Sequence, residues 1–294
     1  MQDAAPSLED ALAKHVGVLA VDIGPRTPFL GDSLSQAEKY IRQVLEGAGL
    51  EVTEQPYQYE GHRVANLIAK LPGAPASPNY YVVGAHYDTV PATPGADDNA
   101  SAVAVMLELA RALAANGSAA PVRLVAFTLE EPPAYETGHQ GSRIFVEECA
   151  RSGERVAGAI VLEMVGYTSP HQNYPSVLRW AGYPNEGNYI GVITNRRSWG
   201  LSRAVVRGLR RNDKLPVESL LVPFNGHILP DTRRSDHASF WNAGLPALMV
   251  TDTAFFRNPN YHLPSDTADT LDFGFMAQLV LGLEKAVAEL PEVL

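Results

Sequence analysis

Side chains that bind divalent metals stand where predicted β-strands or turns end, in five separate segments of this chain. The five positions are His86, Asp98, the pair Glu130-Glu131, Glu163 and His262. In an open α/β sheet the carboxyl ends of the strands form the edge where ligands bind, so distant segments meet there. Imidazole and carboxylate groups together suit zinc, with cobalt or manganese as alternatives. The sequence therefore predicts a metal site at one edge of a sheet.

Strands alternate with helices along the chain, which predicts an α/β fold with a mostly parallel, mixed sheet flanked by helices on both faces. Apolar runs predict strands near 51–58, 64–70, 80–85, 122–128, 157–163, 189–194, 217–222 and 246–251. Helical periodicity and capping signals predict helices near 7–21, 35–47, 139–150, 198–211, 235–243 and 273–289, and another between Asn99 and Gly117.

No linker, internal repeat or low-complexity tract interrupts this pattern, so we expect one domain over residues 1–294. The segment 167–188 is rich in proline, tyrosine, asparagine and glycine and predicts an irregular loop. Loops of that length in compact domains are usually functional or disordered. We expect this loop to shape the substrate pocket.

Charge and composition exclude several classes of partner. The net charge is −10 at pH 7, which argues against binding to nucleic acid or to an anionic membrane, since both favour lysine and arginine. No stretch approaches the roughly 20 apolar residues of a membrane span. The lone Cys149 excludes an intramolecular disulfide. The first ten residues show no signal peptide, so we expect a cytoplasmic location, or a secreted or periplasmic one if a signal has been removed.

Each metal-binding pattern is weak by itself, because histidines and acidic pairs are common on protein surfaces. His86 carries more weight, since it ends the apolar run Val82-Val-Gly-Ala-His86, where a buried imidazole needs a partner. Asp88 follows two residues later and can offer its carboxylate to the second ring nitrogen. This is the carboxylate–histidine–metal arrangement of many metal sites.

Taken together and in order, the motifs resemble those of the family-28 metallopeptidases, which include bacterial zinc aminopeptidases, glutamate carboxypeptidase and glutaminyl cyclase. The resemblance covers about residues 80–272. The matching stretches are Gly84-Ala-His-Tyr-Asp-Thr-Val90, Pro94-Gly-Ala-Asp-Asp-Asn-Ala-Ser101, Phe127-Thr-Leu-Glu-Glu131 with Gly141-Ser142, Leu162-Glu-Met-Val-Gly166, Ser235-Asp-His-Ala-Ser-Phe240 and Tyr261-His-Leu-Pro-Ser-Asp-Thr267.

The resemblance implies two zinc ions bridged by the carboxylate of Asp98. It assigns His86 and Glu163 to one ion and Glu131 and His262 to the other. Many relatives carry aspartate where this chain has Glu163, which places the relative occupancy of the two sites in question. The resemblance also implies a cis peptide bond between Asp98 and Asn99.

The same resemblance implies roles beside the metals. Glu130 is expected to be the general base, and Asp236 to be an acid that hydrogen-bonds near it. Tyr261 resembles a phenol that donates to the oxyanion of the tetrahedral intermediate. Asp88 is the expected partner of the histidine ligand.

Two further features bear on the substrate pocket. The connection from Glu131 to Ser142 is longer and richer in proline than in better-known relatives, and its His139 is either a substrate contact or a surface residue. The aromatic pair Phe255-Phe256 and Tyr167 are candidates for a side-chain pocket, with a place in the core as the equal alternative.

We expect a zinc-dependent aminopeptidase, acting on a peptide or small amide with a free amino terminus. A carboxypeptidase remains an alternative, since the pairs Arg196-Arg197 and Arg233-Arg234 could bind a terminal carboxylate. Glutaminyl cyclase, which works with one zinc ion, is less favoured because all five ligands and the base are present. A metal-binding domain without hydrolytic activity is the remaining alternative, and the oligomeric state is open.

Overall fold

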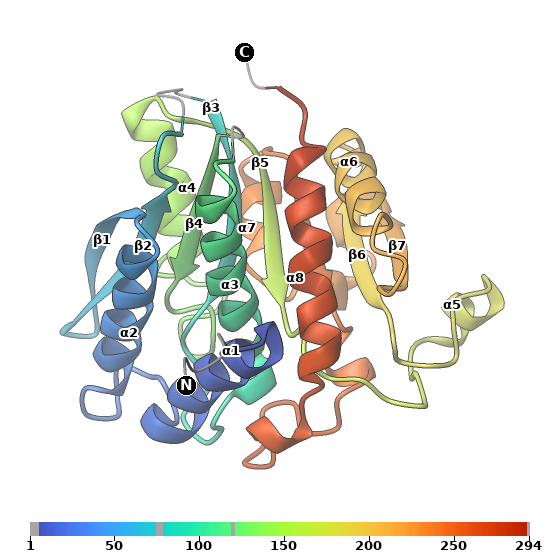
Figure 1. Ribbon diagram of the computed structural model, residues 1–294, viewed down its shortest axis with the longest axis horizontal. Helices are drawn as coiled ribbons and strands as arrows, with labels where there is room; N and C mark the ends of the chain where they lie inside the picture. Colours follow the sequence, from blue (N-terminus) through green and yellow to red (C-terminus); the bar gives the residue numbers. More distant parts are fainter. Residues whose placement is uncertain (1–5, 75–78, 119–120, 293–294) are drawn as a thin grey trace, which may run out of the picture.

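The computed structural model describes residues 6–74, 79–118 and 121–292, and the strands within these ranges form one eight-stranded sheet (Figure 1). The order across the sheet is β1-β2-β4-β3-β5-β8-β6-β7. The strands are β1 (Glu51–Tyr59), β2 (His62–Lys70), β3 (Asn79–His86), β4 (Val122–Phe127), β5 (Arg155–Glu163), β6 (Ile190–Asn195), β7 (Val217–Val222) and β8 (Ala247–Thr251).

The centre of the sheet is parallel and its two flanks reverse direction. Strand β3 pairs in parallel with β4 and β5, and β5 pairs in parallel with β8. The hairpin β1–β2 joins β4 antiparallel, while β6 and β7 run parallel to each other and antiparallel to β8. The predicted mixed sheet is confirmed, and the carboxyl ends of the four central strands share one edge.

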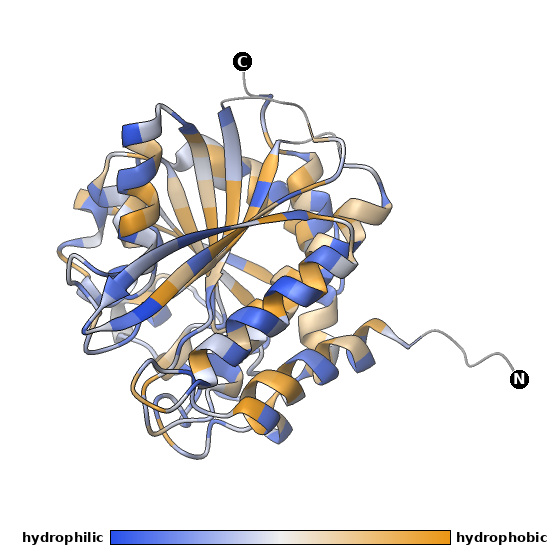
Figure 2. Cartoon of the chain, turned by 90° about the vertical axis from the view of Figure 1, so that its left-hand side faces the viewer, coloured by the Kyte–Doolittle hydropathy of each residue, from blue (hydrophilic) through white to orange (hydrophobic). Residues whose placement is uncertain are grey.

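Helices cover both faces of the sheet, as predicted (Figure 1). One face carries α1 (Leu8–Val16), α2 (Ser33–Gly47), α3 (Ala102–Ala115), α6 (Trp199–Leu209) and α8 (Phe273–Ala288). The other carries α4 (Gly141–Ser152) and α7 (His237–Asn242), which pack on each other. Apolar residues concentrate in the strands and on one side of the helices (Figure 2).

The central strands of the sheet are buried on both faces, which explains their continuous apolar runs. In β3, Tyr81, Val83 and Ala85 join the large core layer under the first group of helices. Tyr80 and Val82 alternate with them and join the smaller layer beneath α4 and α7. The last residue of β3, His86, ends the apolar run with a buried polar side chain.

Two segments are more elaborate than the sequence predicts. The first helix continues beyond Val16 as the π-helical turn η1 (Gly17–Ile23). The loop 167–188 contains the short helix α5 (Ser176–Trp180), and Ser169 and Gly187 form an isolated antiparallel bridge at its base. The loop projects from the sheet in Figure 1.

No helix among the described residues is long and apolar enough to span a bilayer. Residues 1–5, part of the stretch considered for a signal peptide, lie outside the described residues.

The contact between α6 and α8 depends on a glycine. A Cβ atom on Gly208 would lie 2.3 Å from Cα of Ala286, closer than two carbon atoms can pack. Gly200 belongs to the same helix, and a Cβ atom there would meet nothing within 4 Å. We expect Gly208→Ala to lower the free energy of unfolding by about 1–3 kcal/mol through overpacking.

The matched substitution Gly200→Ala should instead raise the free energy of unfolding, by up to about 1 kcal/mol, because alanine favours the helix. Urea unfolding of both variants measures the difference. Equal effects of the two substitutions would contradict a close packing of α6 on α8.

Candidate metal centre

Two groups of potential metal ligands meet at the carboxyl edge of the sheet, and Asp98 belongs to both. In the first, Nε2 of His86 lies 3.4 Å from Oδ1 of Asp98 and 3.4 Å from Oε2 of Glu163. In the second, Nε2 of His262 lies 3.2 Å from Oδ2 of Asp98 and 3.2 Å from Oε2 of Glu131. Within each group the ligand atoms lie within 4.8 Å of one another. Each group therefore has the size of a coordination shell, with one oxygen of Asp98 facing each.

The donor atoms fit divalent cations. Nε2 of His86, Nε2 of His262 and Oε1 of Glu131 are buried and have no hydrogen-bond partner among the described residues. Buried polar atoms are normally paired, because leaving them unpaired costs free energy. A cation in each group would satisfy these atoms and compensate the buried carboxylates. Nitrogen and oxygen donors of this kind suit zinc and its neighbours in the transition series.

The bend that carries Asp98 is fixed by the neighbouring asparagine. The Asp98–Asn99 peptide bond is cis, as predicted. The side chain of Asn99 donates from Nδ2 to the carbonyl of Leu162 at 3.0 Å, and its Oδ1 accepts the amide N–H of Met164 at 2.9 Å. These two bonds join the bend to the backbone on either side of Glu163, which explains how the first ligand group is assembled.

Asp88 lies beside the predicted ligand His86 and also supports a second segment. Its Oδ1 is 3.6 Å from Nδ1 of His86, whereas the backbone carbonyl of Asp88 is 3.2 Å from that nitrogen. Both carboxylate oxygens also accept backbone N–H groups, from Glu130 and from Glu131, at 3.1 Å each. Asp88 therefore positions the Glu130-Glu131 segment against the end of β3.

Asp97 and Asp266 are two buried acids that the sequence did not single out. They also hold the bend that carries Asp98. The carboxylate of Asp266 accepts the backbone N–H groups of Asp97, at 2.9 Å, and Asp98, at 3.1 Å. Asp97 accepts the N–H of Gly166 at 2.9 Å and Nδ2 of Asn258 at 2.7 Å. Asp266 lies inside the quoted stretch 261–267, so its position in that motif was the available signal.

The Ser-Asp-His element at 235–237 reaches the centre through its serine. Oγ of Ser235 donates to Oε2 of Glu163 at 2.6 Å, the same oxygen that faces His86. Asp236 is wholly buried, and neither of its carboxylate oxygens has a hydrogen-bond partner among the described residues. The predicted hydrogen bond of Asp236 near Glu130 is therefore not present in this structure. The positioning role of Ser235 had no separate signal in the sequence.

Burial and crowding shift the ionisation of the acids in this region. Burial raises the pKa of Glu130 well above its usual range, and neighbouring carboxylates, Asp236 among them, add to the rise. Burial, followed by the charge of Asp98, raises the pKa of Glu131 to about 8. Burial alone would lower the pKa of His262, but its contacts with Asp98 and Glu131 outweigh burial and raise that pKa to about 10. The protein thus concentrates negative charge that bound cations would compensate.

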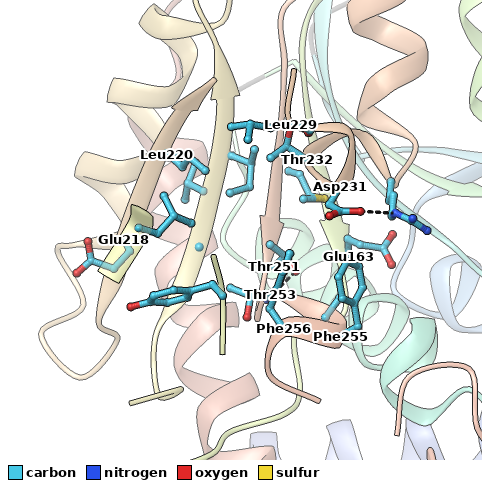
Figure 3. A pocket seen from close by; sticks show the side chains of 18 of the residues that line it. Glu163, Glu218, Leu220, Leu229, Asp231, Thr232, Thr251, Thr253, Phe255 and Phe256 are labelled. Atoms are coloured by element: carbon cyan, nitrogen blue, oxygen red, sulfur yellow. Dashed lines mark hydrogen bonds and ion pairs between the residues drawn. The ribbon is translucent and has the colours of Figure 1, made fainter. Parts of the chain in front are cut away.

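Two cavities adjoin at this edge of the sheet. A small cavity of about 50 Å³ is lined by the acids and His262 of the metal centre, together with Tyr135. A larger one, of about 210 Å³, has a mainly apolar surface, although Glu163, Glu218 and Asp231 are among the residues that line it (Figure 3). Glu163, Arg234 and Tyr261 line both. A molecule bound at the metal centre can therefore extend a side chain directly into the apolar cavity.

The apolar cavity is built from several elements. The loop 167–188 contributes Tyr174, Leu178 and Tyr183, while strands β6, β7 and β8 contribute Ile193, Leu220 and Met249 among others. Of the aromatic residues proposed from the sequence, Phe255 and Phe256 line it, whereas Tyr167 does not. His139 is exposed, lies next to the ring of Tyr59 and lines neither cavity.

Tyr261 lies between the two cavities. Its ring stacks on the imidazole of His262 with 3.8 Å between the ring centroids. Burial, followed by the nearby carboxylates, raises the pKa of Tyr261, so its hydroxyl stays protonated at neutral pH. The phenol therefore remains a hydrogen-bond donor beside the ligand histidine.

Only Arg234, of the arginines considered for a carboxylate-binding site, lines these cavities. Its Nε lies 2.9 Å from Oδ1 of Asp231, so its charge already has a partner (Figure 3). Arg233 bonds to the carbonyl of Asn225 and to the side chain of Asn242. Arg196 and Arg197 are exposed and line neither cavity.

Comparison with known proteins identifies the relatives of this chain. The profile of the family described as "Peptidase family M28" matches residues 66–284. The uncharacterized protein YfbL of Escherichia coli is 37% identical over 286 residues, which cover 93% of this chain and 86% of that protein. Leucine aminopeptidase 1 of Fusarium vanettenii is 29% identical over 261 residues, which cover 83% of this chain and 60% of that protein.

Solved structures share the fold at lower sequence identity. The zinc aminopeptidase BSAP from Bacillus subtilis superposes with a TM-score of 0.74 at 16% identity. The match covers 97% of this chain and 95% of that one. It therefore extends over the whole sheet and its helices.

The hydrogen bond from Ser235 predicts a selective effect on one ligand group. We expect Ser235→Ala to weaken metal binding in the group of His86, Asp98 and Glu163 by about tenfold, because losing a partner that orients a ligand commonly costs 10–100-fold. The group of Asp98, Glu131 and His262 should keep its affinity. Titration with a chromogenic zinc chelator resolves the two affinities.

The matched control is Ser239→Ala. Ser239 accepts a hydrogen bond from Ser142 and touches no predicted ligand. This variant should bind both ions as the unmodified chain does. An equal loss of both affinities in Ser235→Ala would argue against the selective role of Ser235.

Proposed function

Since the chain belongs to peptidase family M28 and is therefore a peptidase, we propose that it is a zinc-dependent aminopeptidase that removes large apolar residues from amino termini. The observation that carries this proposal is the apolar cavity of about 210 Å³ that shares Glu163, Arg234 and Tyr261 with the metal cavity. The first side chain of a peptide would occupy it while the adjoining carbonyl lies at the metal centre. The names of the curated fungal relatives support this reading.

The charge of the site favours an amino terminus over a carboxyl terminus. Of the four acids that line the metal cavity, Glu130 is the one that is not a proposed zinc ligand, and its carboxylate can meet a terminal ammonium group. Among the described residues Arg234 is the only arginine that lines either cavity, and its guanidinium is already paired with Asp231. A carboxypeptidase would need an unpaired arginine there.

The proposed roles follow from the positions of the side chains. His86, Asp98 and Glu163 would hold one zinc ion, and Asp98, Glu131 and His262 the other. Bound zinc lowers the pKa of water and polarises a carbonyl. Glu130, buried and facing the same cavity, takes the proton of the attacking water and passes it to the leaving amine. Tyr261 donates its hydroxyl hydrogen to the developing oxyanion.

The general-base role of Glu130 gives a direct prediction. We expect Glu130→Gln to bind zinc as the unmodified chain does and to lose turnover by about 10²–10⁴-fold, the usual contribution of a general base. Metal content and the kcat for a leucine anilide measure the two properties. Glu136→Gln, in the exposed part of the same connection, is the control and should keep full activity. Near-normal turnover in Glu130→Gln would rule out the proposed base.

The proposed specificity is tested by filling the apolar cavity. Ile193 lines it and Ile228, which is exposed, does not. We expect Ile193→Phe to reduce kcat/KM for leucine and phenylalanine anilides by about tenfold or more while sparing the alanine anilide, because the added ring occupies the space of a large side chain. Ile228→Phe should leave all three unchanged. A uniform loss across the panel would place the first side chain elsewhere.

A substrate panel separates the proposed function from its alternatives. Cleavage of free-amine anilides together with resistance of their N-acetyl forms supports an aminopeptidase. Preference for N-blocked substrates with a free carboxylate supports a carboxypeptidase, and cyclisation of N-terminal glutamine a glutaminyl cyclase. Metal binding without any turnover supports a non-hydrolytic domain. A cytoplasmic location stays a prediction.

A further inference from the structure

Arg26 is a wholly buried arginine next to the segments that form the metal centre. It lies in a part of the chain that precedes the family match at residues 66–284. Arg26 donates hydrogen bonds to five backbone carbonyls and to no carboxylate among the described residues. Nε donates to Tyr87 at 2.8 Å, Nη2 to Gly95 at 2.8 Å, and Nη1 to Leu19, Gly24 and Pro94 at 3.0, 3.1 and 2.7 Å.

These carbonyls belong to the two segments that carry the proposed ligands, to η1 (Leu19) and to the residue that follows η1 (Gly24). Tyr87 directly follows the ligand His86 at the end of β3, and Gly95 begins the bend that leads to Asp98. The backbone of Arg26 adds two bonds to the first segment: its N–H donates to Oγ1 of Thr89, and its carbonyl accepts the N–H of Thr89, both at 2.9 Å. One residue thus joins both ligand-bearing segments.

The close fit around Gly95 shows how tightly the bend is held against Arg26. Gly95 has a φ of +61°, and a Cβ atom on it would lie 2.9 Å from Nη2 of Arg26 and 2.3 Å from the carbonyl oxygen of Asp98. A guanidinium group suits this place because its donors lie in one rigid plane and point in several directions. A lysine ammonium at the same depth could reach only part of the set.

We propose that Arg26 is a positioning residue for the metal centre, which fixes the spacing between the histidine ligand on β3 and the bridging carboxylate of Asp98. The N-terminal segment is then part of the site even though it supplies no ligand. The inference rests on the metal centre of the proposed function, but it does not depend on which substrate is cleaved.

The experiment measures zinc binding by the full chain and by the variants Arg26→Lys and Arg26→Met, using zinc alone in competition with a chromogenic chelator. We expect both variants to bind zinc about 10–100-fold more weakly, the usual cost of losing a group that orients ligands. Arg26→Lys should recover little of the zinc affinity, because lysine restores the positive charge but not the set of carbonyl contacts. Wild-type affinity in Arg26→Lys would overturn the proposal.

A second variant separates positioning from general stability. Leu12 is wholly buried in α1 and touches no ligand-bearing segment through a hydrogen bond, so Leu12→Ala should lower the melting temperature and keep wild-type zinc affinity. If Leu12→Ala loses zinc affinity as Arg26→Lys does, the effect of Arg26 is one of stability alone and the proposal fails.

If Arg26→Met does not fold, Arg26→Lys carries the test through the rise in melting temperature that zinc produces, which reports affinity for the folded state. A rise equal to that of the unmodified chain would overturn the proposal. Failure of the unmodified chain to bind zinc would instead refute the proposed function, so the two failures are distinguishable.

Discussion

The burial of many acidic side chains at one edge of the sheet is the constraint on which the rest of this structure depends. Asp98, Glu130, Glu131 and Glu163 all lie within a few residues of strand ends or tight bends and are almost wholly buried. Carboxylates in such surroundings repel one another and lose their hydration, at a cost that protein interiors rarely tolerate without compensation. The two imidazoles provide part of that compensation, and their unpaired nitrogens face the same two points as the carboxylates. Cations at those points would let these side chains stabilise the fold instead of opposing it.

A second set of acids fixes the positions of the segments that carry these carboxylates. Asp88 and Asp266 each accept two consecutive backbone N–H groups, from 130–131 and from 97–98. These segments are irregular, so their amides have no sheet partners and need others. The acids therefore satisfy the backbone and place the ligands at the same time. Ser235 and Asn99 act in the same way on Glu163 and on its flanking backbone.

Much of this arrangement could be predicted from the sequence, and the part that could not has a common physical reason. The strands and most helix bounds follow from apolar periodicity and capping signals in short stretches of chain, and the family resemblance implied the cis bond at Asp98. The two ligand groups also meet as the motif order implied. The roles of Arg26, Ser235 and Asp88 could not be predicted in this way. Each of these side chains contacts backbone or side-chain atoms that are far away in sequence. A lone arginine or serine has no local pattern that shows which distant carbonyl or carboxylate it will meet.

The bend at 94–98 is held by distant contacts with side chains of opposite charge. Its carbonyls at Pro94 and Gly95 accept hydrogen bonds from Arg26, while its amides at 97 and 98 donate to Asp266. A positive group holds the start of the bend and a negative group holds its end, so the backbone is satisfied in both polarities next to the kink at Asp98 and Asn99. Either contact alone would leave the other half of the bend free to shift, and Asp98 must face two ligand groups at once. The opposed pair explains how a bend with non-helical φ and ψ at Asp98 can hold that carboxylate in one position, facing both groups.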